Sequence, residues 1–463
     1  MLLVGAGVGI VLVVGQAAVE DYRVSPRRFS DAVRAGVDLS SVNLFPQTGS
    51  RYTYSFSPID EYLAYERRFL PVDAELVGLL VDGIAEAVAW RMLLASGAED
   101  PTTAEAMLWA RGEGRRIPEW IAEELAKAGV IYAQETLLSR SVDPALHDTV
   151  LYHLDCDLIS HVFLHVGYRL DLDLREISSP LHTYLYYAGP QGEPLYIEPT
   201  AFRQTTVRDG MVEVGRIGVG PGFFIRSDYH RERGSVRASP ELVTAAGFYE
   251  IATERDIRDG IVSEVMVGLS GLARQRDDVE LMATVGSELA AHLEGTRDPN
   301  LVSNLFLHHL HQGEAALVAG DLVAAQAEVD AARQLRGSHD ALLVHSEPME
   351  SVLAAQVLAA GGERVAAVSL LESICAEYDV GKAELPVAQS ATHADALLTL
   401  AGLVAPGRSA YNRLVLPILN FEARVFSGGN SDRRIAAWRL CGEMLAGVDP
   451  DRAAVCEAEA EGR

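Results

Sequence analysis

A thiol, an imidazole and a carboxylate, the three groups of a nucleophilic acyl-transfer site, stand in chain order at Cys156, His182 and Glu198. A thiol attacks a carbonyl once a neighbouring base has taken its proton, and a carboxylate bound to that base fixes its tautomer. The alternative interpretation is a small buried cysteine packed at the start of a helix, with an unrelated histidine nearby. The elements that hold these residues therefore matter as much as the residue types.

Cys156 is expected in the first turn of a helix. Asp155 is well placed as the N-cap, and the apolar side chains that follow fall on one helical face up to Gly167, the expected residue after the helix end. The N-terminus of a helix stabilises a thiolate and lowers its pKa from about 8.5. The carboxylates of Asp155 and Asp157 oppose this effect, because nearby negative charge raises the pKa of a thiol.

Two expected strands carry the other two residues. The first begins at Leu181 and ends at Tyr187, and the second begins at Leu195 and ends at Glu198. If Tyr187 pairs with Leu195 in an antiparallel hairpin, Glu198 lies diagonal to His182 on the same face of the sheet. Diagonal neighbours are about 7–8 Å apart at the backbone, so the carboxylate can reach the imidazole.

Two motifs around these residues carry a family resemblance. The runs Ser179-Pro180-Leu181-His182-Thr183-Tyr184-Leu185 and Tyr196-Ile197-Glu198-Pro199-Thr200, after Cys156 and its apolar helix, resemble the transglutaminase-like Cys-His-Asp/Glu superfamily. The likeness is greatest to bacterial members in which this core is followed by tetratricopeptide-like helices.

The resemblance implies that Cys156 is the nucleophile, His182 the general base and acid, and Glu198 the carboxylate that orients the histidine. Such folds attack an amide or ester carbonyl through an acyl-thioester, and many bacterial members look like peptidases or amidases. Tyr152, one turn upstream of the cysteine, is the candidate oxyanion donor. One departure is Asp155, because family members commonly have a small residue just ahead of the cysteine.

Helical and strand patterns alternate along the chain. The pattern is helical from about Asp73 to Leu138, and it changes to β-branched and aromatic residues with Gly and Pro turns between Ile177 and Phe224. Nearly everything after Ser239 is helical and rich in alanine. The expected strands are 181–187, 195–198, 211–214 and 223–226. An aromatic stretch, made of Tyr52, Tyr54, Phe56, Tyr62 and Tyr65, either docks onto the core or lines a substrate groove.

The helical part after residue 239 contains a near-repeat. The run that begins at Gly320 matches the run that begins at Gly362, at an offset of 42 residues, and each follows one helix and starts another. Glycine and alanine at such turns allow close packing of helical hairpins. The segment 313–332 resembles a tetratricopeptide repeat, with Ala315, Ala316, Gly320, Ala324 and Ala325 as its close-packing positions. Because the offset exceeds the usual period, we expect an insertion near 337–347.

The first 19 residues allow three interpretations. Leu2 to Gly15 is an unbroken apolar run, which predicts a signal peptide or a membrane anchor and hence an exported or membrane-anchored protein. The second interpretation is a buried structural segment, in which case the protein is cytoplasmic. The third is a dinucleotide-binding loop, which the run disfavours because Ile10 follows Gly9 and the expected third glycine is missing.

Composition excludes several classes of protein. The net charge of −26 repels phosphate backbones, so we expect no nucleic-acid partner, and four cysteines are too few for a disulfide framework. Two groups of histidines could each bind a metal, namely His161 with His165, four residues apart on one helix face, and His308 with His309 and His311. Neither group has the HExxH pattern or a nearby pair of cysteines, so core or surface histidines are the better interpretation. We therefore expect no metal and no cofactor.

Together these observations predict an α+β protein with a papain/transglutaminase-like core of one helix and a small antiparallel sheet. The expected domains are 1–19 (signal peptide or anchor), 20–135 (mostly helical), 136–238 (transglutaminase-like core) and 239–463 (helical-hairpin repeats). One functional hypothesis is a cysteine-dependent acyl hydrolase or transferase whose repeats recruit a protein or peptide substrate. The other is a catalytically inactive member that serves as an interaction scaffold. The oligomeric state stays open.

Overall fold

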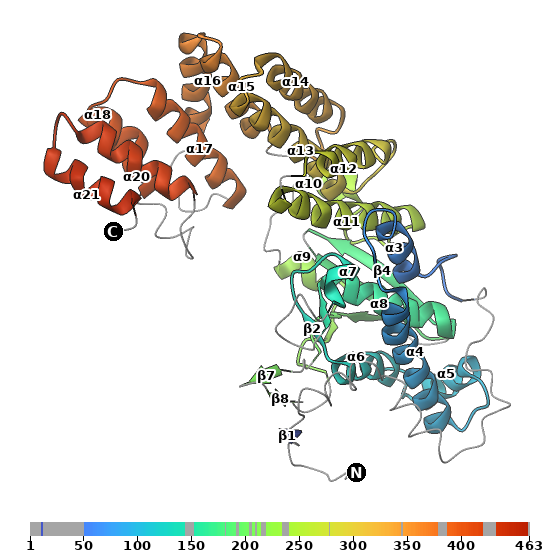
Figure 1. Ribbon diagram of the computed structural model, residues 1–463. Coiled ribbons are helices and arrows are strands. Elements are labelled where there is room, and N and C mark those ends of the chain that lie inside the picture. The colour runs from blue at the N-terminus through green and yellow to red at the C-terminus, as the bar shows by residue number, and fades with distance from the viewer. Residues whose placement is uncertain are drawn as a thin grey trace. The chain divides into compact units, whose positions relative to one another are not determined.

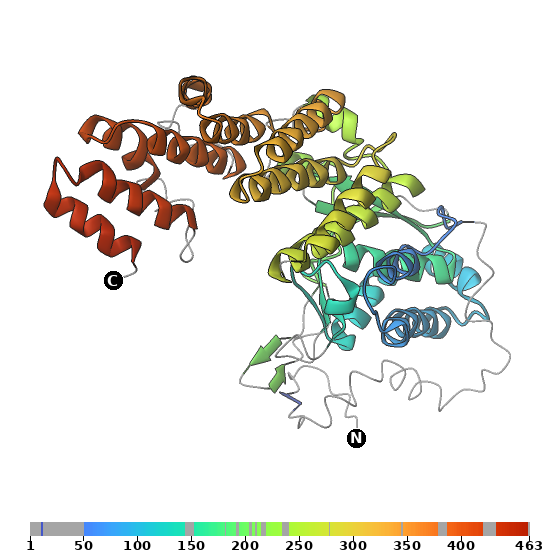
Figure 2. The same ribbon diagram turned by 45° about the horizontal axis from the view of Figure 1, so that its top comes forward.

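The computed structural model describes residues 11–12, 51–143, 152–180, 182–190, 194–202, 206–208, 211–213, 219–233, 240–276, 278–343, 346–377, 387–419 and 432–461. Within these ranges helices predominate over small sheets, so the chain is an α+β protein, as expected. It divides into two compact units, residues 1–301 and 302–463 (Figures 1 and 2).

The first unit holds all of the described strands and the helices around them. Its helices are α3 (Pro58–Glu66), α4 (Ala74–Ser96), α5 (Pro101–Ala110), α6 (Arg116–Ala128), α7 (Leu138–Ser141), α8 (Cys156–Leu170), α9 (Tyr229–Arg233), α10 (Pro240–Ala246), α11 (Glu254–Arg276) and α12 (Val279–Ala291). Its strands are β1 (Val11–Leu12), β2 (Val130–Tyr132), β3 (Tyr152–Leu154), β4 (Asp173–Ser179), β5 (His182–Ala188), β6 (Leu195–Ile197), β7 (Thr206–Arg208), β8 (Met211–Glu213) and β9 (Phe224–Ile225).

The largest sheet is antiparallel, with the strand order β4-β5-β6-β9. Tyr187 pairs with Leu195, as predicted, and the same register continued by one more pair places Glu198 beside Tyr184. The first predicted strand began at Leu181, so the sequence analysis missed β4 entirely; the polar residues Asp173 and Arg175 obscure its alternation. Two smaller sheets complete the set, the parallel pair β2-β3 and the antiparallel order β1-β8-β7.

Helix α8 lies at the centre of the first unit, where it packs against α3 and α4 as well as β4 and β5. Asp155 is its N-cap, as predicted, with a side chain that accepts a hydrogen bond from the Leu158 backbone N–H. The expected end at Gly167 is wrong, because the helix continues to Leu170. Asp171 takes the left-handed conformation there (φ 55°), which its short polar side chain tolerates.

Gly167 is instead a point of close contact inside the helix. A Cβ atom at this position would lie 3.0 Å from Leu174 Cβ and 3.2 Å from Tyr52 Cε2. Tyr52 therefore docks onto the core, which is one of the two alternatives that the sequence left open for the aromatic stretch. Tyr52 and Tyr54 are buried, and Asp171 Oδ1 accepts hydrogen bonds from the backbone N–H groups of Arg51 and Tyr52.

Helix α11 also belongs to this unit. It packs against α3 and α12, so helical structure beyond residue 239 contributes to the unit that contains α8. The rest of the predicted repeat region follows from residue 302.

In the second unit, the elements within the described ranges are all helices (Figure 2). They are α13 (Pro299–Val318), which begins at the unit boundary, α14 (Leu322–Ser338), α15 (Glu347–Ala360), α16 (Arg364–Glu377), α17 (Val387–Leu403), α18 (Arg408–Ala410), the π-helix η1 (Tyr411–Val415), α20 (Asp432–Leu445) and α21 (Pro450–Ala460). A disulfide joins Cys441 on α20 to Cys456 on α21, while Cys156 and Cys375 are free.

The near-repeat corresponds to two helical hairpins, α13–α14 and α15–α16. Gly320 and Gly362 hold the turns at φ values of 79° and 89°, where other residues are strained. Of the expected close-packing positions, Ala325 is fully buried, but Ala315 is exposed. Gly313 is a further point of close approach, because a Cβ there would come within 2.7 Å of Leu353 Cδ2.

The prediction for residues 1–19 falls mostly outside the described residues. Only Val11–Leu12 are described, as strand β1, which pairs antiparallel with β8. In the described part of the chain, no helix has both the length and the apolar character needed to cross a membrane.

The contact at Gly167 gives a test of the packing around α8. Gly167→Val should destabilise the first unit by about 1–3 kcal/mol, because the added methyl groups overfill the space next to Leu174. The matched control is Gly78→Val in α4, where no atom lies within 4 Å of the added Cβ. Urea unfolding followed by tryptophan fluorescence measures both variants, and equal midpoints would contradict the close contact.

Candidate functional site

The structure places the three predicted site residues on adjoining elements. Cys156 is the first residue of α8, His182 is the first residue of β5, and Glu198 directly follows β6. The neighbours of the first two residues are joined directly, since Thr183 Oγ1 donates a hydrogen bond of 2.5 Å to Asp157 Oδ1. The start of the helix is thereby tied to the start of the strand.

His182 and Glu198 meet, as the predicted register requires. His182 Nε2 lies 2.8 Å from Glu198 Oε2, and the other carboxylate oxygen accepts a hydrogen bond of 2.6 Å from Thr200 Oγ1. Burial raises the pKa of Glu198, but its interactions with His182, His230 and Thr200 outweigh that effect and lower the pKa to about 2. The carboxylate is therefore ionised throughout the physiological pH range.

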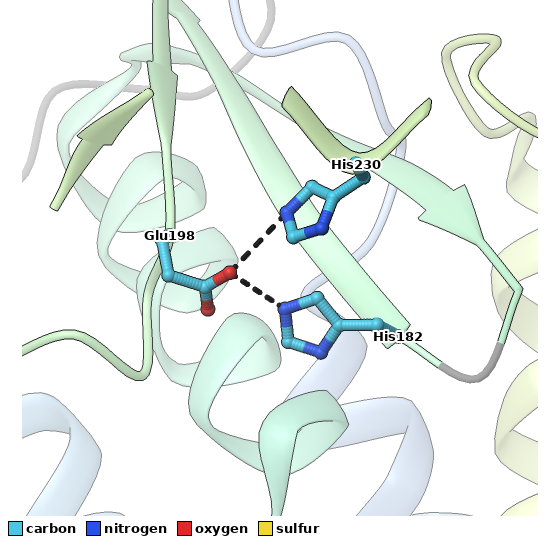
Figure 3. Close-up of side chains that lie close together, drawn as sticks. All are labelled: His182, Glu198 and His230. Atoms are coloured by element: carbon cyan, nitrogen blue, oxygen red, sulfur yellow. Dashed lines mark hydrogen bonds and ion pairs between the residues drawn. The ribbon is translucent and has the colours of Figure 1, made fainter. Parts of the chain in front are cut away.

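An ionised carboxylate only accepts hydrogen bonds, which assigns the tautomer of His182. Nε2 carries a proton and donates to Glu198, so Nδ1 holds the lone pair of the neutral ring. Figure 3 shows this second nitrogen on the side of the ring away from Glu198. Burial lowers the pKa of His182, but the hydrogen bond and charge of Glu198 raise it above the ordinary value, which makes His182 a stronger base.

A second histidine, His230, joins this pair and was missed by the sequence analysis. It comes from α9, and its Nε2 lies 3.2 Å from the same oxygen, Glu198 Oε2 (Figure 3). Its ring centroid is 4.9 Å from that of His182 and 4.6 Å from that of Tyr184. The sequence signal that could have found His230 is its position, four residues after the expected strand 223–226. In the structure this strand, β9, pairs with β6, the strand just before Glu198.

The environment of Cys156 differs from the expectation for a helix N-terminus. Its thiol donates to Asp157 Oδ2 at 3.7 Å, and among the described residues it makes no hydrogen bond to His182. Burial raises the pKa of the thiol far above its usual range, and the carboxylates of Asp157, Asp155 and Glu264 raise it further. The helix N-terminus thus does not yield a resting thiolate, because desolvation and three acids outweigh it.

The acids beside Cys156 form a cluster of neighbouring carboxyl groups. One oxygen each from Asp155, Asp157 and Glu264 lies within 4.8 Å of the others. Burial and then the charges of Asp157 and Asp155 raise the pKa of Glu264 to about 9, so this side chain is protonated at neutral pH. Burial likewise raises the pKa of Asp155. A protonated Glu264 reduces the negative charge that faces the thiol.

Tyr152, the candidate oxyanion donor, lies in β3. Its side chain is 1% exposed, and its backbone N–H donates to the Gly129 carbonyl. The structure therefore shows its position in the small parallel sheet, and its part in catalysis stays a prediction.

The histidine sets weighed in the sequence have separate partners. His165 lies between Ser57 Oγ (2.8 Å) and Asp82 Oδ1 (3.2 Å), whereas His161 Nε2 lies 3.5 Å from Glu176 Oε2. Within the described ranges, the group with mixed nitrogen and oxygen ligands is His182, Glu198 and His230, whose ligand atoms lie within 4.8 Å of one another.

Comparison with protein-family models, with curated proteins and with solved structures finds no match for this chain.

The Glu198 interaction predicts a change in the titration of His182. In Glu198→Gln, the pKa of His182 should fall below its ordinary value near 6.5, because burial remains while the neighbouring charge is gone. NMR titration of the histidine ring signals measures this shift. Glu328→Gln, which removes the partner of His309, is the matched control and should leave the His182 titration unchanged.

The same pair makes a pH-dependent contribution to stability. Since the pKa of His182 is raised in the folded state, this contribution is fully present below about pH 6.5 and is lost as the pH rises through the folded-state pKa. If NMR gave the same His182 titration in wild type and in Glu198→Gln, that result would contradict the interaction between His182 and Glu198.

Proposed function

We propose that the chain is a cysteine-dependent acyl hydrolase or transferase, peptidase- or amidase-like, built on a transglutaminase-like core. The observation that carries this proposal is the 2.8 Å contact between His182 Nε2 and Glu198 Oε2. It fixes a basic lone pair on Nδ1 of a histidine whose strand is tied to the helix of Cys156. A buried carboxylate, an oriented imidazole and a thiol at a helix start form a nucleophile, base and orienting acid.

The proposed reaction begins with a neutral thiol. As Cys156 Sγ attacks an amide or ester carbonyl, its proton moves to His182 Nδ1, and the sulfur–carbon bond forms. The amine or alcohol leaves with that proton, which restores the neutral imidazole and leaves an acyl-thioester on Cys156. Water completes hydrolysis, or a second amine completes transfer, with His182 again taking and returning the proton.

The raised pKa of the thiol is compatible with this order of events. A base needs only to remove the proton during attack, so a standing thiolate is not required. Glu198 stabilises the imidazolium that forms in that step, and its low pKa keeps it charged. The helical hairpins α13–α14 and α15–α16 support the further proposal that the second unit recruits a protein or peptide substrate.

One observation favours the alternative, an inactive member that acts as an interaction scaffold. The thiol donates a hydrogen bond to Asp157. Burial and the charges of three acids also raise its pKa, so the thiol stays protonated. In that case the fold around Cys156 is only structural, and the helical hairpins carry the function.

Acylation by p-nitrophenyl acetate distinguishes the two functions. An active Cys156 releases nitrophenolate in a burst and retains an acetyl group, which peptide mass spectrometry locates. His182→Gln should slow this acylation by about 10²-fold or more, since proton transfer by a placed base contributes about 10²–10⁴-fold. Cys156→Ala should abolish the burst.

Two controls accompany this experiment. Cys375 is a free thiol in the same chain whose pKa burial raises to about 11, and its slow reaction should not depend on His182. His309→Gln removes a histidine that also faces an acid, Glu328, and should react as the wild type does. Acylation of Cys156 that is absent, or equal in wild type and His182→Gln, would refute the enzyme and leave the scaffold.

A further inference from the structure

The cluster of His182, Glu198 and His230 has more ligand atoms than proton transfer needs. Three elements, β5, the end of β6 and α9, bring two imidazole nitrogens to one carboxylate oxygen (Figure 3). A catalytic base requires a single carboxylate contact, and His182 already has one. His230 is therefore unexplained by the proposed reaction.

We propose that His182 Nε2, Glu198 Oε2 and His230 Nε2 bind a zinc ion, and that this ion switches off the Cys156 site. The binding site stands on the geometry of the three ligands alone. Its regulatory role rests on the proposed function, because it acts on the base of that reaction.

The spacing of the three atoms fits a small tetrahedral ion. With Zn–N and Zn–O bonds of about 2.0–2.1 Å, neighbouring ligand atoms of a tetrahedral site lie roughly 3.3 Å apart. The two nitrogens lie 2.8 and 3.2 Å from Glu198 Oε2, and all three atoms fall within 4.8 Å of one another. Shifts of a few tenths of an ångström along each contact would make room for the ion.

The chemistry of the donors favours zinc over calcium or magnesium. Two imidazoles and one carboxylate suit a borderline cation, whereas calcium and magnesium prefer oxygen ligands. His230 Nε2 is buried and, although it lies at ion-pair distance from Glu198, it has no hydrogen bond of acceptable geometry among the described residues. Thr200 holds the second oxygen of Glu198, which orients the ligating carboxylate as an outer partner does in metal sites.

Metal binding at Nε2 would reverse the tautomer of His182. Glu198 now holds the proton on Nε2 and leaves the lone pair on Nδ1. When an ion takes the Nε2 lone pair, the neutral ring must carry its proton on Nδ1 instead. His182 then has no free lone pair with which to accept the thiol proton, so the zinc-bound form of the site cannot start the reaction.

Cobalt(II) is the probe for the site, because tetrahedral Co²⁺ with nitrogen ligands absorbs strongly in the visible region and replaces zinc. The full-length chain is stripped with a chelator, dialysed and titrated with Co²⁺, and zinc then displaces the cobalt. The expected result is one equivalent of tetrahedral Co²⁺ per chain. His230→Gln should weaken binding by more than about 100-fold, since even outer partners of a metal site are worth about 10–100-fold.

The controls separate this site from other histidines and from misfolding. His309→Gln should bind Co²⁺ as the wild type does, because His309 faces Glu328 in the second unit. Glu198→Gln is a second ligand variant, and thermal unfolding of each variant confirms that it is folded. Absence of tetrahedral Co²⁺ in wild type, or equal binding in wild type and His230→Gln, would overturn the metal site.

The acylation assay then tests the regulatory role. One equivalent of zinc should slow acylation of Cys156 by about 10²-fold or more, the size expected for loss of the base. A fast reaction of the zinc-loaded protein would overturn the switch. Tetrahedral Co²⁺ binding in a chain whose stripped form is not acylated would support the metal site and refute both the enzyme and the switch.

Discussion

The interaction on which the site depends is the contact of two imidazole rings with the single buried carboxylate of Glu198. Removing a carboxylate from water is costly, and hydrogen bonds and opposite charge offset that cost. Glu198 recovers it through His182, His230 and Thr200, and the result is a carboxyl group that stays ionised at all physiological pH values. The tautomer and the basicity of His182 follow from this charge. The proposed proton transfer and the proposed metal site also depend on this charge, since both use the same oxygen, Glu198 Oε2.

On the thiol side of the site the pKa values are shifted the other way, so that protons stay bound. Around Cys156, burial and mutual repulsion raise the pKa values of Asp155 and Glu264 and keep protons bound. One hydrogen bond, from Thr183 to Asp157, joins this proton-rich region to the strand of His182. The site thus places an ionised carboxylate and a strong base on one side, and a protonated thiol among partly protonated acids on the other. Proton transfer between the two sides is the chemistry that such an asymmetry supports.

Local sequence patterns predicted the parts that depend on local physics. Asp155 as an N-cap, the pairing of Tyr187 with Leu195 and the glycine turns at Gly320 and Gly362 rest on capping, strand alternation and backbone sterics. The end of α8 was wrong because Gly167 is required for its small size at a contact with Tyr52, more than 100 residues away in sequence. His230 and Glu264 were missed for a similar reason. Both reach the site from elements later in the chain, α9 and α11, and no local sequence pattern predicts that these elements pack beside the site. The raised pKa of Cys156 is a property of this assembly, although Asp155 and Asp157 pointed in its direction.

The carboxylates around Cys156 also affect how fast the thiol is oxidised. Peroxides oxidise the thiolate far faster than the neutral thiol, and the first product, a sulfenic acid, leads on to irreversible forms. A cysteine held neutral by burial and by Asp157 is therefore a poor target for oxidants in the absence of substrate. The acids that slow spontaneous ionisation would keep the sulfur chemically intact over the lifetime of the protein. The slow ionisation of the thiol and its resistance to oxidation would then have the same cause, the burial of Cys156 among acids.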